Sequence, residues 1–192
     1  MKNHFLISLI GFVLIGTHCL SADAVSRFIN QEKLHREDLS SLIGNKVQDD
    51  SALLNKPAPK FELRDLTGKI YSLEKLKGKI VVLNFWFIAC KPCVNEMPVL
   101  NRIKKKYDPA KVVFLALSLD GKAAIHAFLQ THQFDYTILP QAASVGEKYS
   151  LYAYPTSMVI NAAGTISFVQ VGGPNIEGNL RAAINMALKA CN

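Results

Sequence analysis

The chain has 192 residues, of which 49% are hydrophobic and 19% are charged, and its formal net charge is +7 at pH 7. This composition is typical of one globular domain with a shorter addition, and it excludes an intrinsically disordered chain. The positive charge comes from scattered lysines, and the densest run, Lys104–Lys106, has no aromatic residues between its members. A solvated helix face explains this pattern better than a nucleic-acid surface does.

The first 24 residues resemble a secretory signal peptide, which we expect to be cleaved after about Ala24. Lys2 precedes an uncharged run, Phe5–Gly16, and small residues stand at the alternate positions Ala22 and Ala24. The apolar run is shorter than the roughly 20 residues that a membrane-spanning helix needs. We therefore expect an exported, periplasmic or otherwise extracytoplasmic protein without stable membrane insertion, and a membrane anchor formed by residues 5–20 is the alternative.

Residues 25–55 are polar with scattered apolar positions, which predicts a helical or partly disordered lead. Two prolines in Asn55–Pro59 end it, and residues 56–192 are predicted to form the folded domain. The domain opens with a β-hairpin, in which the strands Phe61–Leu66 and Lys69–Leu73 meet at Thr67-Gly68.

Strand and helix patterns then alternate along the chain. Strands are predicted at Ile80–Phe87, Val112–Leu119, Tyr136–Leu139, Thr156–Ile160 and Thr165–Val171, and the last two are joined by the hairpin turn Asn161–Gly164. Helices are predicted at Cys93–Tyr107, Lys122–His132, Val145–Tyr149 and Ile176–Ala190. This order predicts an α/β fold, in which a central mixed β-sheet carries helices on both faces.

A close cysteine pair is the chain's strongest functional signal. Cys90 and Cys93 stand one helical turn apart, directly after a strand, and cleavage of the signal peptide would leave only Cys191 besides them. An odd number of cysteines with one tight pair indicates redox chemistry rather than a set of structural disulfides. Only a thiolate attacks a disulfide, and a helix N-terminus favours the anion. Cys90 is therefore the expected nucleophile, and Cys93, one turn further in and more buried, is the expected resolving thiol.

Neighbouring residues fit this interpretation. Lys91 brings a positive charge next to Cys90, and Pro92 suits a first helical turn, where its missing N–H is not needed. Glu96 falls on nearly the same helix face as Cys93, where it is either a catalytic carboxylate or a surface residue stabilised by the helix dipole.

Other interpretations of the polar residues remain open at this point. The cysteine pair could be a static disulfide or half of a zinc site, although zinc needs four ligands and no second Cys-x-x-Cys is present. Cys191 falls on the apolar stripe of the last helix and is expected to be a buried or frayed thiol. His126 and His132 are expected to be surface or packing residues.

Four ordered segments of the chain resemble TlpA/ResA-type members of the thioredoxin superfamily, within the broader AhpC/TSA-redoxin-like group. These segments are Pro57–Gly68, Asn84–Pro98, Tyr154–Thr156 and Ala163–Ile166. The resemblance implies a thioredoxin-like fold and an extracytoplasmic thiol-disulfide oxidoreductase without cofactor or metal. Its redox-active disulfide would join Cys90 and Cys93.

The resemblance also implies a docking surface for the substrate. Pro155 would be a cis proline that faces the dithiol, and the backbone of Tyr154 would pair with a substrate strand. Trp86, Lys91 and Pro92 complete the expected substrate-binding set.

Two departures from relatives stand out. Asn84 occupies the position where thioredoxins carry a buried aspartate, and an amide cannot take up a proton. This makes Glu96 the candidate acid/base. Ile88-Ala89 stands where many relatives have a polar residue and a tryptophan, which affects the substrate contact surface rather than the chemistry.

We therefore expect a monomeric disulfide reductase. Its partners would be disulfide-containing envelope proteins, for example apocytochrome c, and a membrane electron donor that reduces the cysteine pair again. Three alternatives remain: a thiol oxidant on the same site, a peroxidase, and a copper or metal carrier that uses Cys90, Cys93 and a histidine. A peroxidase of this fold would need a proline and a threonine or serine at set distances before the cysteine, and the residues before Cys90 supply neither.

Overall fold

The computed structural model describes residues 53–190. The predicted signal peptide, nearly all of the predicted lead and Cys191 lie outside these residues. Across the described range, no helix is both long and apolar enough to cross a membrane.

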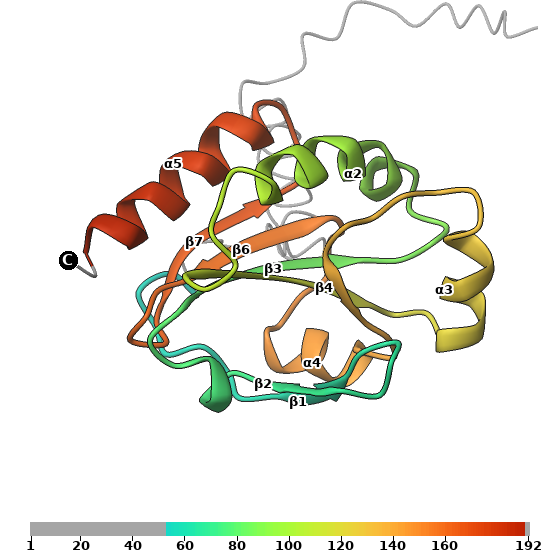
Figure 1. Ribbon diagram of the computed structural model, residues 1–192, viewed down its shortest axis with the longest axis horizontal. Helices are drawn as coiled ribbons and strands as arrows, with labels where there is room; N and C mark the ends of the chain where they lie inside the picture. The colour runs from blue at the N-terminus through green and yellow to red at the C-terminus, as the bar shows by residue number, and fades with distance from the viewer. Residues whose placement is uncertain (1–52, 191–192) are drawn as a thin grey trace, which may run out of the picture. The chain divides into compact units, whose positions relative to one another are not determined.

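A five-stranded mixed sheet forms the centre of the domain, with the strand order β5-β4-β3-β6-β7 (Figure 1). Strands β3, β4 and β5 run parallel, whereas β6 is antiparallel to both β3 and β7. Every residue of β3 is buried, as its continuous apolar sequence predicted. The bounds are Ile80–Trp86 for β3, Val112–Ser118 for β4, Thr137–Leu139 for β5, Thr156–Ile160 for β6 and Ile166–Val171 for β7.

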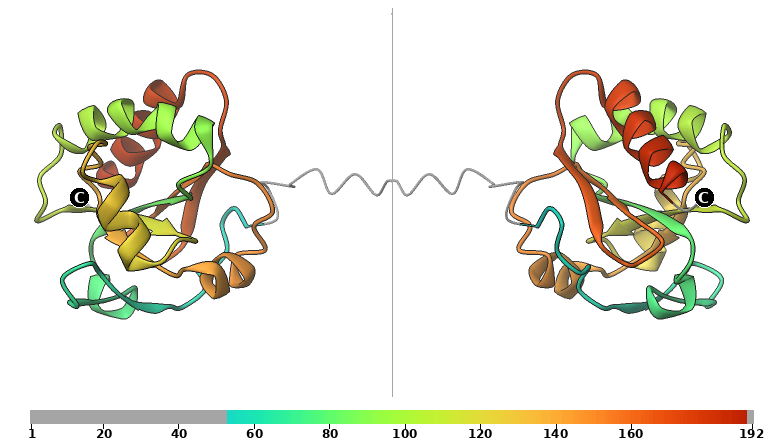
Figure 2. Two further views of the ribbon diagram at one scale, coloured as in Figure 1. Left: turned by 90° about the vertical axis from the view of Figure 1, so that its right-hand side faces the viewer. Right: turned by 90° about the vertical axis from the view of Figure 1, so that its left-hand side faces the viewer.

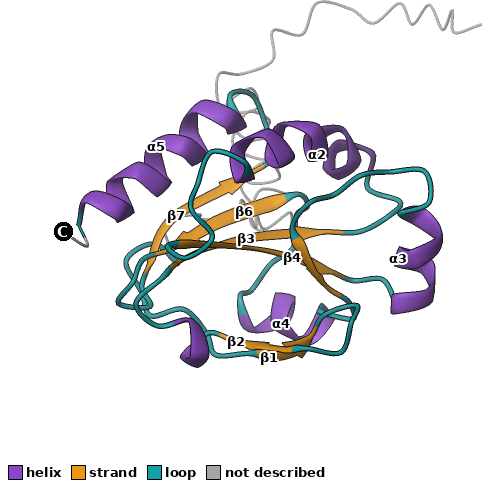
Figure 3. Cartoon of the chain, viewed as in Figure 1, coloured by secondary structure: helices purple, strands orange, loops and turns teal. Residues whose placement is uncertain are grey.

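Helices cover both faces of this sheet, which confirms the predicted architecture (Figures 1 and 2). On one face, the core joins the sheet to α2 (Lys91–Lys104), α3 (Lys122–Phe128) and α5 (Ile176–Lys189). On the other face, a second core joins it to α4 (Ala143–Lys148) and to the N-terminal hairpin. The strands of that hairpin are β1 (Glu62–Arg64) and β2 (Ile70–Ser72), and the short helix η2 (Glu74–Leu76) follows them (Figure 3).

Both predicted hairpin turns are confirmed. In the first, the Asp65 carboxylate accepts hydrogen bonds from the backbone N–H groups of Thr67 and Lys69, and Gly68 has a φ of 95°. In the second, the Asn161 side chain accepts from the backbone of Ala163, and Gly164 has a φ of 85°. Glycine is favoured at both positions because side chains with a Cβ rarely adopt positive φ.

The predicted helix bounds differ from the structure in an informative way. Helix α2 begins two residues earlier than predicted, at Lys91, and it ends at Lys104 rather than at Tyr107. The apolar spacing continues into the following turn because the Tyr107 ring packs against Phe114, with their ring centroids 6.0 Å apart. Periodicity therefore reported the buried positions correctly but overestimated the length of the helix.

Candidate active site

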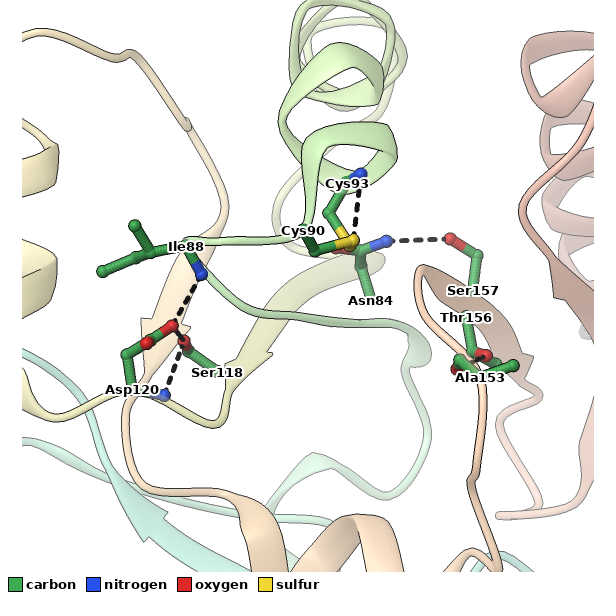
Figure 4. Close-up of a disulfide and its surroundings, with 9 residues drawn as sticks. All are labelled: Asn84, Ile88, Cys90, Cys93, Ser118, Asp120, Ala153, Thr156 and Ser157. Carbon is green, nitrogen blue, oxygen red and sulfur yellow. Dashed lines mark hydrogen bonds between the residues drawn. A yellow bond between two sulfur atoms is a disulfide. The ribbon is translucent and has the colours of Figure 1, made fainter. Parts of the chain in front are cut away.

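The two cysteines lie at the carboxyl end of β3, where the chain turns into α2, and they are joined as a disulfide (Figure 4). Cys90 is the N-cap of α2, and its sulfur accepts a hydrogen bond of 3.2 Å from the backbone N–H of Cys93. Cys90 is 6% exposed and Cys93 is 2% exposed, in the predicted order of burial. The sulfur that would react with a partner is thus the one nearer the surface.

The first turn of α2 favours a negative charge at Cys90. Its backbone N–H groups have no helical carbonyl partners, and this turn contains no acidic side chain. Lys91 and Pro92 are both exposed there, next to Cys90, and their role in substrate binding stays a prediction. When the disulfide is reduced, this helix end can stabilise a thiolate on Cys90.

An aspartate that was not predicted anchors the loop before Cys90. The Asp120 carboxylate accepts hydrogen bonds from the backbone N–H of Ile88 at 2.7 Å and from the Ser118 hydroxyl at 3.0 Å (Figure 4). Asp120 follows β4, which is parallel to β3, and the carboxyl ends of parallel strands meet at one edge of a sheet. A carboxylate directly after β4 was therefore the sequence feature from which the position of Asp120 near the cysteine loop could have been predicted.

Removing the Asp120 carboxylate is expected to destabilise the protein. We expect Asp120→Ala to lower the free energy of unfolding by about 1.5–3 kcal/mol, because two hydrogen bonds to a charged acceptor are lost. Urea unfolding measures this change. Asp108→Ala is the matched control, because Asp108 also accepts a backbone hydrogen bond, from Ala110, but in an exposed turn. Equal losses in the two variants would contradict a special role for Asp120.

A neutral polar pair links β3 to β6 in the sheet that carries the cysteine loop. The Asn84 side chain on β3 donates a 3.1 Å hydrogen bond to the Ser157 hydroxyl on β6, and each residue is 2% exposed (Figure 4). The two residues face each other across the antiparallel strand pair. Neither side chain titrates near neutral pH. This pair therefore cannot exchange a proton with the cysteines near neutral pH.

Glu96 is the acidic group closest in sequence to the cysteines, and its environment alters its titration. The residue is half-buried on α2, and burial raises the pKa of its carboxyl from 4.5 to about 7. A carboxyl that titrates near neutral pH can both accept and donate a proton under physiological conditions. This environment fits the acid/base role predicted for Glu96.

The raised pKa of Glu96 makes stability depend on pH. The pKa of Glu96 is higher in the folded state than in the unfolded state, so ionisation of this group destabilises the fold. The free energy of unfolding therefore keeps its full value below about pH 4.5, and part of it is lost as the pH rises through about 7. We expect Glu96→Gln to match the parent near pH 4 and to be more stable by about 1–2 kcal/mol at pH 8.5, after allowance for solvent screening. Thermal unfolding of the oxidised protein at both pH values measures this difference. A variant less stable than the parent at pH 8.5 would contradict the burial of the charge.

The predicted proline loop is present, and the peptide bond between Tyr154 and Pro155 is cis. Pro155 is buried, whereas Tyr154 is partly exposed, and its ring meets Phe87 of the cysteine loop edge to face with a centroid distance of 5.4 Å. Within residues 53–190, the backbone N–H and carbonyl of Tyr154 make no hydrogen bond.

Trp86 is not part of the surface, which corrects the prediction that it contacts substrate. It is the last residue of the central strand, and its side chain is 0% exposed. Its ring packs in the core against Phe128 and Phe134, each with a centroid distance of 5.6 Å. A docked protein cannot reach this ring.

The histidines lie where they were expected. His126 and His132 are exposed, and His132 stacks on Phe128 with a centroid distance of 4.0 Å. Nowhere in the described part of the chain do three histidine, cysteine, aspartate or glutamate side chains gather closely enough to hold a metal ion.

A dithiol at the N-terminus of the helix that follows the central strand, with a cis-proline loop on the same mixed sheet, defines a thioredoxin-like protein. Solved structures agree with this class. A thiol:disulfide interchange protein of the thioredoxin family from Chlorobium tepidum superposes with a TM-score of 0.60 at 27% identity, covering 70% of this chain and 97% of its own.

Sequence comparison identifies the family. Residues 54–169 match the AhpC/TSA family, and the chain belongs to it. It is 36% identical over 118 residues to the thioredoxin-like protein YneN of Bacillus subtilis, covering 60% of this chain and 69% of the relative. It is also 36% identical over 115 residues to the thiol-disulfide oxidoreductase ResA of Bacillus cereus, covering 59% and 66%, respectively. The chain thus spans about two thirds of the length of these relatives, and the resemblance to ResA-type proteins is confirmed.

Proposed function

We propose that this protein is an extracytoplasmic thiol-disulfide oxidoreductase that reduces disulfide bonds in other proteins. The observation that carries the proposal is the disulfide between Cys90 and Cys93, with Cys90 as the N-cap of α2. This arrangement places a helix N-terminus at the sulfur that must become a thiolate. The relatives named thiol-disulfide oxidoreductases and thiol:disulfide interchange protein support the same reaction class.

The reaction starts from the reduced pair. The Cys90 thiolate attacks one sulfur of the substrate disulfide, which forms a mixed disulfide and releases the other substrate sulfur as a thiolate. The Cys93 thiolate then attacks the sulfur of Cys90, which closes the Cys90–Cys93 disulfide and releases the second substrate thiolate. The substrate gains two electrons and two protons; the cysteine pair loses two electrons and the proton of Cys93, and solvent supplies the second proton.

The second step needs a proton acceptor for the Cys93 thiol, and Glu96 is the residue suited to it. Its carboxyl titrates near pH 7, and it stands three residues after Cys93 on the same helix. The carboxylate takes the thiol proton as Cys93 attacks, and the carboxylic acid can then return a proton to the departing substrate thiolate. The neutral pair Asn84 and Ser157 offers no alternative acid on the strand side.

Substrate would dock beside the proline loop. The backbone groups of Tyr154, which have no partner within residues 53–190, would pair with a short extended segment of the substrate in β-strand fashion. Lys91, Pro92 and Pro155 would border that segment, and the contact between Phe87 and Tyr154 ties the docking loop to the cysteine loop.

Compartment and partners are proposed from the sequence. Export through residues 1–24 would place the protein in the periplasm or an equivalent compartment, where a membrane electron donor would reduce the cysteine pair again. Its substrates would be envelope proteins with disulfides, for example apocytochrome c. The chemistry needs only the two sulfurs and a proton carrier, so no cofactor is invoked.

Insulin reduction and a redox titration test the proposed function. We expect the protein to accelerate precipitation of insulin by dithiothreitol, and we expect a reduction potential below about −220 mV, on the reducing side of protein disulfide isomerase. The buried ring of Trp86 supplies a fluorescence signal for the titration. A rate equal to that of dithiothreitol alone would reject the proposal. A potential near −120 mV would instead assign the protein to thiol oxidation.

A further inference from the structure

Two buried polar groups in the core lack a hydrogen-bond partner among residues 53–190. They are the indole N–H of Trp86 and the hydroxyl of Tyr136. Trp86 is 0% exposed and Tyr136 is 3% exposed. An unpaired donor in a protein interior costs about 1–3 kcal/mol, so such a group calls for an explanation.

Both groups belong to one aromatic stack. The Trp86 ring meets Phe134 edge to face at 5.6 Å, and Phe134 stacks on Tyr136 at 4.9 Å, both between ring centroids. This stack shares its core with Cys90, Cys93 and the buried face of α2. The two unpaired donors are thus in the same core as the dithiol.

Helix α2 is fixed against the segment that carries Tyr136. The side chain of Asn101 on α2 donates to the carbonyl of Gln133 at 2.9 Å and accepts from the backbone N–H of Asp135 at 2.7 Å. Tyr136 is the next residue. The position of the Tyr136 ring relative to α2 is therefore set by two hydrogen bonds and by packing, not by a flexible loop.

Glu96 is the only acidic residue of α2, the helix that packs against the segment carrying Tyr136. Burial and the nearby Glu96 carboxylate both raise the pKa of Tyr136, so the phenol is a neutral donor across the physiological range. No cation offsets the burial of Glu96, since burial alone accounts for its raised pKa. The other charged groups on α2 and its C-cap, on the segment after α3 and on α5 have their own contacts or face solvent: Lys91, Arg102, Lys104, Lys105, His132, Asp135, Glu177, Arg181 and Lys189.

We propose that the Tyr136 hydroxyl donates a hydrogen bond to the Glu96 carboxylate whenever that carboxylate is ionised, and that Tyr136 is a positioning residue for proton transfer at Cys93. The inference rests on the proposed function of the dithiol. A hydrogen bond from a donor that serves only the ionised form favours that form over the protonated one. The Tyr136 hydroxyl thus binds the carboxylate form of Glu96, which is the form that acts as a base.

Tyr136→Phe tests this role, because it removes one oxygen and leaves the ring stack in place. We expect the midpoint of the pH profile for disulfide exchange to move upward by about one pH unit, as loss of a hydrogen bond to a charged group predicts. Infrared or carbon-13 titration of the Glu96 carboxyl should show the same displacement. The thermal stability of the oxidised protein at pH 5 should be unchanged or higher, because an unpaired buried hydroxyl is removed.

Tyr149→Phe is the matched control. Tyr149 is equally buried, but it lies in the core on the other face of the sheet and donates to the carbonyl of Pro59 at 3.0 Å. This variant should leave the midpoint unchanged. Tyr136→Phe should also cause no displacement in a Glu96→Gln background, because the effect passes through Glu96.

The outcomes separate the inference from the proposed function. A Tyr136→Phe profile that coincides with the parent, while Glu96→Gln removes the pH dependence, would overturn the role of Tyr136 and leave Glu96 as the acid/base. A Glu96→Gln profile with the parent's midpoint would instead remove Glu96 from the proposed mechanism.

Discussion

Cys90→Ser is expected to lose disulfide reduction completely. The serine hydroxyl cannot form the mixed disulfide, so the rate of insulin reduction should fall to that of the reductant alone, at least about a thousandfold below the parent. The substitution exchanges one atom at the N-cap, and serine is itself a good N-cap residue. The variant should therefore fold, and far-ultraviolet circular dichroism will check this.

Cys93→Ser is the matched control for this result. Cys90 can still attack a disulfide in this variant, but the mixed disulfide can no longer be resolved from within the protein. We expect a single rapid reaction that stops at one equivalent. Catalytic turnover in Cys90→Ser, or turnover at the parent rate in Cys93→Ser, would contradict the assigned order of attack.

Glu96→Gln is expected to have the next largest effect, and it should depend on pH. In the parent protein, resolution by Cys93 should accelerate as the pH rises through about 7, because the Glu96 carboxylate then accepts the thiol proton. The variant should be slower by about a hundredfold at pH 8. The two rates should converge well above pH 9, where an ordinary thiol ionises without a base.

Stopped-flow tryptophan fluorescence across pH 5–10 will measure these profiles. Glu147→Gln is a suitable control, since Glu147 is exposed on α4 on the other face of the sheet. Its profile should coincide with that of the parent. If Glu96→Gln also retained the parent's profile, another group would have to accept the proton of Cys93.

Much of the fold followed from local sequence patterns. The continuous apolar run of β3 predicted a strand buried on both faces, and the Asn161–Gly164 turn predicted the hairpin between β6 and β7. Boundaries were less predictable, because tertiary contacts determine where the apolar spacing stops being helical. Tyr107 continues the apolar spacing of α2, but it lies in the turn after the helix, where its ring packs on Phe114.

The reacting residues of the site were more predictable than the residues that hold the cysteine loop and its strand in place. The residue types and their spacing predicted the pair Cys90 and Cys93, which the structure joins as a disulfide, and Glu96 as acid/base stays a prediction. Asp120 and Ser157 were missed because they are far in sequence from the cysteines. Asp120 follows β4 and Ser157 is on β6, and only the pairing of these strands with β3 brings them to Ile88 and Asn84. Trp86 was misplaced because proximity in sequence to Cys90 does not report the side of the strand on which a ring lies.

The most direct test of the account is to identify the sulfur that first bonds to a substrate. The full chain is reduced, mixed with a peptide disulfide, quenched with acid and mapped by mass spectrometry, with Cys93→Ser used to hold the intermediate. The account predicts that the peptide is attached to Cys90 in the parent and the variant, and that none is attached in Cys90→Ser. Attachment to Cys93 in the parent, or an adduct in Cys90→Ser at the parent rate, would contradict it.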